Sequence, residues 1–151
     1  MLRPDEQRLE HILDYCNRIE KTVARYGRSY ELFLSDMDYQ QSIAFSIFQI
    51  GELSGHLSPE FREATSSEIP WVVIKAMRNI VVHSYNHVNL DTLWDTALHD
   101  IPSLKAFCED RLNLSHTPTV LDTICKDATA RASELNADKT ALAQDAPEPQ
   151  R

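Results

Sequence analysis

The stretch Ile43-Ala44-Phe45-Ser46-Ile47-Phe48-Gln49-Ile50-Gly51-Glu52-Leu53 decides the fold class of this chain. Apolar side chains occupy almost every side of a helix drawn through it. Such a helix is central, or it is covered by a second subunit, because no face of it is polar enough for water. Asp36 is placed to cap the start of this helix through its short carboxylate. The segment therefore predicts a helical core and, with it, a homodimer.

An amphipathic helix is expected before this segment. Residues 5–26 place apolar side chains three and four positions apart, which is the spacing of one buried helix face. Gly27 is positioned to end that helix. Residues 29–35 are interpreted as a short connector, from which three side chains pack back on the core: Tyr30, Leu32 and Phe33.

Further helices are expected after the central one. Pro102 lies inside the last of them and should kink it, because proline lacks a backbone donor and clashes with the preceding turn. Each helix begins at a proline in its first turn or at a capping side chain: Ser58-Pro59 for a short helix, Pro70 for a helix over about residues 70–85, and Asn89 or Asp91 for the last.

The chain is predicted to be all-α, with an antiparallel bundle of about five helices in residues 1–113. Residues 114–151 are expected to form a weakly helical to disordered tail. From Lys126 onward large apolar side chains are almost absent, and the chain ends near Ala146-Pro147-Glu148-Pro149. Such a composition buries too little surface to offset the entropy lost on ordering.

Composition places limits on the function. The formal net charge is -8, which argues against broad non-specific binding of nucleic acid, since that binding needs many contacts from Lys and Arg to phosphate. Any action on RNA therefore needs a local basic site or a partner. No apolar run approaches the roughly 20 residues that span a bilayer, and residues 1–10 contain no signal-peptide core. The three scattered cysteines, Cys16, Cys108 and Cys125, fit a cytoplasmic protein without a disulfide framework.

The segment most suited to chemistry is Met77-Arg78-Asn79-Ile80-Val81-Val82-His83-Ser84-Tyr85. At about 100° per helical residue, Asn79 and His83 lie on one face, one turn apart, and Arg78 shares a face with Tyr85. Arg78 and His83 are roughly 140° apart on the same helix. Both side chains reach one pocket only near a helix end, or where a second subunit completes the site.

Arg78-Asn79-x-x-x-His83-x-Tyr85 resembles the R-x4-H-x-Y motif of the HepT-like toxins of the HEPN superfamily. The resemblance covers roughly residues 5–110 and includes Ile50-Gly51-Glu52, Ile69-Pro70-Trp71, Leu93-Trp94 and Ile101-Pro102. It implies a helical homodimer in which two motifs face each other across a cleft. It also implies an endoribonuclease that needs no metal or other cofactor.

The resemblance implies a role for each motif residue. His83 would exchange protons with the 2′-hydroxyl or the leaving oxygen, since imidazole titrates near neutral pH. Arg78 would stabilise charge on the phosphate, and Asn79 would orient a phosphate oxygen or His83. The family's usual partner is a small nucleotidyltransferase antitoxin that can add AMP to the motif tyrosine, here Tyr85.

Two residues depart from the pattern of many relatives. Ser84 stands where glycine is frequent, and Ile80 stands where a basic residue is frequent. The lost positive charge weakens the expectation of RNA binding. It favours a second hypothesis, in which the chain is a catalytically weak helical dimer that binds a nucleotidyltransferase or serves as its AMPylation target.

Each motif residue also has a purely structural interpretation. Arg78 can pair with a carboxylate of the neighbouring helix, such as Glu52. His83 can cap a helix end, where the dipole favours a cation, and Tyr85 can be an ordinary packing aromatic. His83 and His87 are four apart, as in zinc hydrolases, but the chain lacks the glutamate that follows the first histidine of those sites. We therefore expect no metal site.

Overall fold

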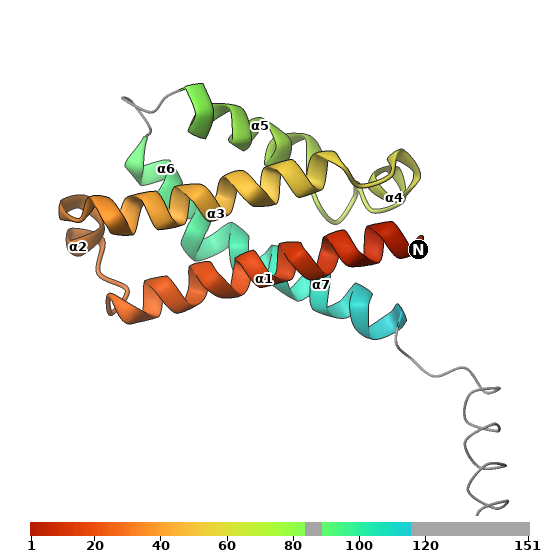
Figure 1. The fold of residues 1–151 in the computed structure, drawn as a ribbon, viewed down its shortest axis with the longest axis horizontal. Helices are drawn as coiled ribbons and strands as arrows, with labels where there is room; N and C mark the ends of the chain where they lie inside the picture. Colours follow the sequence, from red (N-terminus) through yellow and green to blue (C-terminus); the bar gives the residue numbers. More distant parts are fainter. Residues whose placement is uncertain (84–88, 116–151) are drawn as a thin grey trace, which may run out of the picture. The chain divides into compact units, whose positions relative to one another are not determined.

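The fold is all-α, as the sequence predicts (Figure 1). The computed structural model describes residues 1–83 and 89–115, with the side chains of residues 80–83 and 114–115 excepted, and these residues contain no strand. The predicted tail lies outside the described residues from position 116 onward. The elements are α1 (Arg3–Arg25), α2 (Tyr30–Ser35), α3 (Met37–Gly55), α4 (Pro59–Ala64), α5 (Trp71–His83), α6 (Leu90–Asp95), a π-helical turn η1 (Thr96–Asp100) and α7 (Ile101–Ser115).

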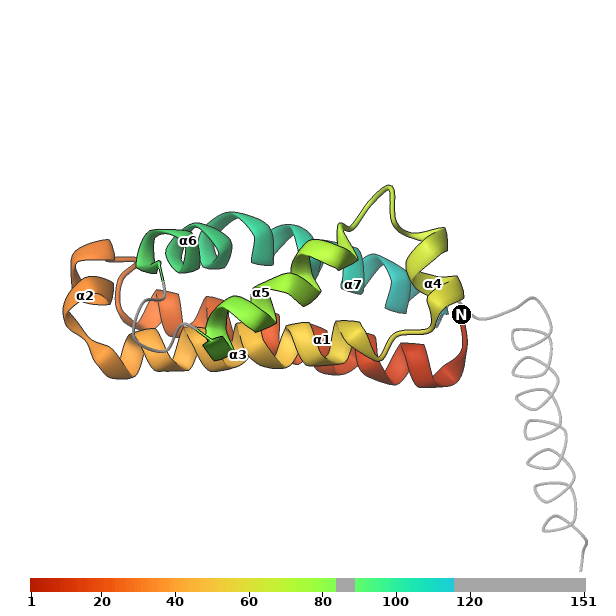
Figure 2. The same ribbon diagram turned by 90° about the horizontal axis from the view of Figure 1, so that it is seen from above.

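The long helices α1 and α3 run antiparallel and side by side, and α3 is the central element (Figures 1 and 2). On its other side α3 packs against α5, which runs back antiparallel to it, while α7 packs against α1. Of the two alternatives predicted for the apolar segment, a central position or cover by a second subunit, the arrangement shows the first. None of the described helices is both long and apolar enough to cross a bilayer.

The core forms where these helices meet, and its α1 and α3 members follow the predicted periodicity. Ile43, Ile47 and Ile50 of α3 are buried against the α1 stripe that includes Ile12 and Ile19. At the α2 end, aromatic rings complete the core. Phe33 is fully buried, with its ring centroid 5.2 Å from that of Tyr39 and 5.2 Å from that of Trp94.

The connector predicted for residues 29–35 is wrong in its local structure, because residues 30–35 form the helix α2. Ser29 explains the helix: its hydroxyl accepts a hydrogen bond from the amide of Leu32 at 3.2 Å, which satisfies a donor of the first turn. Phe33 packs in the core as expected, whereas Leu32 is 47% exposed and does not. A six-residue helix presents only part of its side chains to the core.

The other predicted helix starts are confirmed by their caps. Asp36 accepts from the amide of Tyr39 at 2.9 Å at the start of α3. Asn89, rather than Asp91, caps α6, accepting from two backbone amides. In place of a simple kink at Pro102, the structure has the π-helical turn η1 just before it. A π-helical turn is wider than an α-helical one, so it makes room where the proline ring would clash with the carbonyl four residues earlier.

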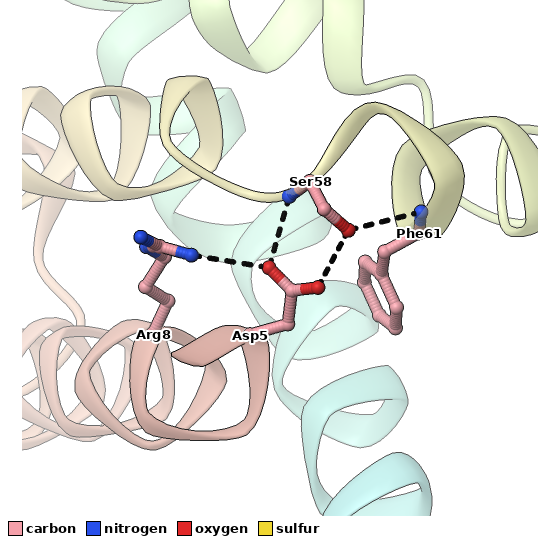
Figure 3. A network of polar contacts seen from close by, with 4 residues as sticks. All are labelled: Asp5, Arg8, Ser58 and Phe61. Atoms are coloured by element: carbon pink, nitrogen blue, oxygen red, sulfur yellow. Dashed lines mark hydrogen bonds and ion pairs between the residues drawn. The ribbon is translucent and has the colours of Figure 1, made fainter. Parts of the chain in front are cut away.

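A buried carboxylate joins the first helix to the start of α4 (Figure 3). Asp5 is 1% exposed, and it accepts from the backbone amide of Ser58 at 2.9 Å and from its hydroxyl at 2.6 Å. Arg8 donates to the same carboxylate at 3.2 Å. Burial opposes ionisation, but the hydrogen bonds from Ser58 and the charge of Arg8 outweigh it and hold the pKa of Asp5 below its ordinary value.

Cys16 of α1 and Cys108 of α7 are free thiols with no exposed surface. Burial raises the pKa of both, that of Cys108 to about 12, so neither thiol ionises at neutral pH. They contribute to the core as small apolar side chains.

Candidate active site

The candidate active site is built on α5, whose N-terminal end is firmly anchored. Trp71 is 5% exposed, and its indole N–H donates to the hydroxyl of Thr65 at 2.8 Å. Its ring packs against Phe107 of α7, with centroids 5.7 Å apart. This anchor holds the first turn of α5 in one position relative to the bundle.

Arg78 lies in the middle of α5, where the helix crosses α3. Its Nε forms an ion pair with Oε1 of Glu52 on α3. The side chains of Arg78 and Glu52 are 40% and 31% exposed, but the contacting atoms Nε and Oε1 are buried, so the contact lies inside the seam between the two helices while the rest of both side chains reaches the surface. The structural interpretation of Arg78 as a partner of Glu52 is therefore correct, and the guanidinium occupies a defined place at the surface.

Gly51 brings the two helices together at this point. A Cβ atom on Gly51 would lie 2.8 Å from Cβ of Arg78 and 3.3 Å from the carbonyl oxygen of Ile74. Real Cβ atoms essentially never come as close as the first distance, so only glycine permits this approach. One turn later, Gly55 leaves more room, with the nearest atom, Cε of Lys75, 3.9 Å from its added Cβ.

The other predicted site residues are less completely placed. Asn79 is exposed on α5, next to Arg78 in sequence and about 100° around the helix. His83 is the last residue of α5, and its side chain is outside the described part of the chain. Tyr85 and His87 also lie outside the described residues. The structure thus brings Arg78 together with Glu52, and it does not test the meeting of Arg78 with His83.

Two apolar side chains in the first turn of α5 are exposed. Val72 is 84% exposed and Val73 is 56% exposed. At about 100° per residue, the backbone positions of Val72, Ala76, Asn79 and His83 follow one another along a single face. On α3, Phe45 is 53% exposed, although the sequence predicts no solvated face for that helix.

Sequence reasoning missed the packing role of Gly51. Gly51 and Gly55 are four residues apart, so they share one face of α3. Two glycines at that spacing inside an otherwise apolar helix are the signal that would have indicated a close helix–helix contact. Among the described residues, no group of three or more His, Cys, Asp or Glu side chains is arranged to hold a metal ion.

Comparison with known proteins agrees with the resemblance seen in the motif. The family described as ribonuclease HepT-like matches residues 12–111. The chain is 38% identical to "Putative RNase TTE0752" of Caldanaerobacter subterraneus subsp. tengcongensis over 97 residues, which are 64% of this chain and 84% of that protein. It is 33% identical to "Probable ribonuclease HepT" of Thermococcus cleftensis over 105 residues, which are 70% of this chain and 93% of that protein.

No solved structure gives a significant match. The family match begins within α1 and ends within α7, so it spans the described bundle and includes Gly51, Glu52, Arg78 and His83. The chain belongs to the ribonuclease HepT-like family.

Proposed function

We propose that this protein is a metal-independent endoribonuclease and the toxin of a cytoplasmic toxin–antitoxin pair. Its RNA would bind in a cleft that two copies of the R-x4-H motif form across a homodimer. The observation that carries the proposal is the placement of Arg78, five residues before His83, on a helix that Trp71 and Gly51 fix against the bundle. The ribonuclease names of two relatives support the same activity.

The reaction assigned to the motif is transesterification of the RNA backbone. The 2′-oxygen of a ribose attacks the adjacent phosphorus while His83 accepts the 2′-hydroxyl proton. The bond from phosphorus to the 5′-oxygen breaks, and that oxygen takes a proton from an imidazolium, such as His83 of the second copy. The products are a 2′,3′-cyclic phosphate and a 5′-hydroxyl. Arg78 stabilises the charge that develops on the phosphate oxygens.

The local charge is consistent with a small phosphate site. The chain carries a net charge of -8, so its affinity for RNA has to come from few contacts. Arg78 is half-exposed and held in place, and it can present a cation at one phosphate without a broad basic surface. We therefore expect weak general binding of RNA together with cleavage that depends on the motif.

Replacing motif residues tests this function. His83→Ala should lower RNA cleavage about a hundredfold to ten-thousandfold, because the proton transfer loses its catalyst. Arg78→Ala should lower it by about a hundredfold or more, because the charge on phosphorus loses its stabiliser. The measurement is the rate of cleavage of several labelled RNAs, with Lys21→Ala on the exposed side of α1 as the control. Equal rates for His83→Ala and wild type would contradict the proposal.

The dimer is proposed from the two exposed valines in the first turn of α5. A second copy that covers Val72 and Val73 would bury them and bring two motifs together, because the positions of Asn79 and His83 lie on the same face as Val72. Such an interface supplies the second half of the cleft.

A charge in this face tests the dimer. Val72→Asp should give a monomer in light scattering at micromolar concentration and should abolish cleavage, because an unpaired carboxylate is costly to bury in an interface. Leu34→Asp is the control, since Leu34 is 47% exposed on α2 and should tolerate the same charge. A dimer that survives Val72→Asp would refute this placement of the interface.

The antitoxin assigned to the pair is a small nucleotidyltransferase that transfers AMP to Tyr85. A bulky anion there would occupy the cleft that RNA needs and would compete for Arg78. The second candidate function, a catalytically weak dimer that serves as the target of this transfer, is favoured by Ile80 and by the net charge of -8. Absence of cleavage by a folded, unmodified dimer, together with AMP transfer to Tyr85 detected by mass spectrometry, would favour it.

A further inference from the structure

The contact between Glu52 and Arg78 has a geometry that bears on how the arginine meets a phosphate. The ion pair is made through Nε, the inner nitrogen of the guanidinium. The planar guanidinium presents parallel N–H groups to a phosphate at its two terminal nitrogens as well as along its Nε edge. A carboxylate on Nε therefore restrains the plane of the guanidinium and leaves the pair of terminal nitrogens for a phosphate.

Stability does not explain the pair. The side chains of Glu52 and Arg78 are 31% and 40% exposed, although their contacting atoms Oε1 and Nε are buried, and ion pairs between partly exposed side chains contribute little to folding. The packing of α3 against α5 at this point depends instead on Gly51, whose missing side chain admits Cβ of Arg78. Gly51 therefore determines the position of the Arg78 backbone, and Glu52 restrains the position of the Arg78 guanidinium.

We propose that Glu52 is a positioning residue for the ribonuclease reaction, one that holds Arg78 ready to bind the phosphate at which RNA is cut. The inference rests on the proposed function of Arg78. It assigns to α3 a part of the site in addition to the motif on α5. A long arginine side chain without this restraint samples many rotamers, and the loss of orientation slows a reaction that depends on it.

Two substitutions of Glu52 form the kinetic test. Glu52→Ala should lower kcat for RNA cleavage by about tenfold to a hundredfold, as expected for a misplaced catalytic group, with a smaller change in KM. Glu52→Gln keeps an oxygen acceptor at nearly the same reach and should retain part of the lost rate. Both variants should keep the thermal midpoint close to that of the wild type. Glu60→Gln, at an exposed carboxylate of α4, makes the same chemical change away from α5 and is the matched control.

A spectroscopic readout tests the contact without any activity. In the proton–nitrogen NMR spectrum, the Nε–H of Arg78, assigned by its loss in Arg78→Lys, should exchange slowly with water in the wild type and in Glu60→Gln. It should exchange much faster in Glu52→Ala. The experiment uses the full chain and needs no RNA.

The outcomes separate the two proposals. If the wild type cleaves RNA and Glu52→Ala cleaves equally fast, the positioning role is wrong and the ribonuclease stands. If Glu52→Ala cleaves faster than the wild type, Glu52 restrains Arg78 from its substrate and the proposal is overturned. If the wild type cleaves nothing while Arg78 Nε–H is protected by Glu52, the contact exists and the proposed function fails.

Discussion

Gly51→Ala should lower the free energy of unfolding by about 1–2 kcal/mol and should also slow RNA cleavage. The added Cβ would lie 2.8 Å from Cβ of Arg78, an atom fixed to the backbone of α5, so the helix itself has to move. Overpacking of this kind costs about 1–3 kcal/mol, and the better helix propensity of alanine offsets at most about 1 kcal/mol of it. The clash therefore outweighs the gain in helix propensity, and Gly51→Ala destabilises the protein.

Gly55→Ala provides the matched control because it makes the same change one turn away on the same helix. The nearest atom to its added Cβ is 3.9 Å away, which is ordinary van der Waals contact. This substitution should raise the free energy of unfolding by up to about 1 kcal/mol. Urea denaturation of both variants measures the difference. Stabilisation by Gly51→Ala, equal to that by Gly55→Ala, would show that α5 does not lie as close to α3 as described.

The activity of the same two variants adds a second readout. Moving α5 away from α3 displaces Arg78 from Glu52, so Gly51→Ala should cleave RNA roughly a hundredfold more slowly under conditions where it is still folded. Gly55→Ala should cleave at the wild-type rate. The comparison measures how strongly the chemistry depends on the contact between these helices.

Asp5→Ala should lower the free energy of unfolding by about 2–3 kcal/mol at pH 7. Asp5 is 1% exposed, and its carboxylate accepts hydrogen bonds from the amide and the hydroxyl of Ser58 (Figure 3). The same hydroxyl caps α4 by accepting a hydrogen bond from the amide of Phe61. Removing the carboxylate leaves these donors without their acceptor and detaches α1 from the start of α4. Asp14→Ala, at an exposed carboxylate of the same helix, should change stability by less than about 0.5 kcal/mol.

The effect of Asp5 depends on pH, with a sign that follows from its lowered pKa. At neutral pH the carboxylate is ionised in both the folded and the unfolded chain, and its stabilising contacts are fully present. As the pH falls through the ordinary value of 3.8, the unfolded chain takes up the proton first, so stability is lost until the lower folded pKa is reached. The wild type should therefore lose more stability below about pH 5 than Asp5→Ala does. Parallel losses in the two proteins would contradict the lowered pKa.

The helices were predictable from sequence wherever local chemistry decides them. Asp36 and Asn89 carry side chains that satisfy the amides of a first turn, and both begin helices as expected. The same signal from Ser29 does not by itself indicate α2, because the six residues after it are too few to show a clear periodicity. Long apolar segments were assigned correctly since burial and helical spacing agree along them.

Contacts between distant residues were harder to predict. Asp5 lies in the first turn of α1, where the helix dipole favours a carboxylate, and only the fold shows that Ser58, 53 positions later, donates two hydrogen bonds to it. The sequence predicts the pairing of Arg78 with Glu52 only as one of several alternatives, because it gives the charges but not the distance between them. The spacing of Gly51 and Gly55 indicates a close helix contact on one face of α3, but no local pattern specifies that Arg78 is the residue that Gly51 admits.

The most direct test of the proposed function is cleavage of RNA by the purified wild-type protein in the presence of EDTA, with analysis of the product ends and with His83→Ala in parallel. The account predicts fragments that end in 2′,3′-cyclic phosphate and begin with 5′-hydroxyl, and it predicts that they disappear in the variant. Loss of cleavage in EDTA, products with 3′-hydroxyl ends, or equal cleavage by His83→Ala would contradict it.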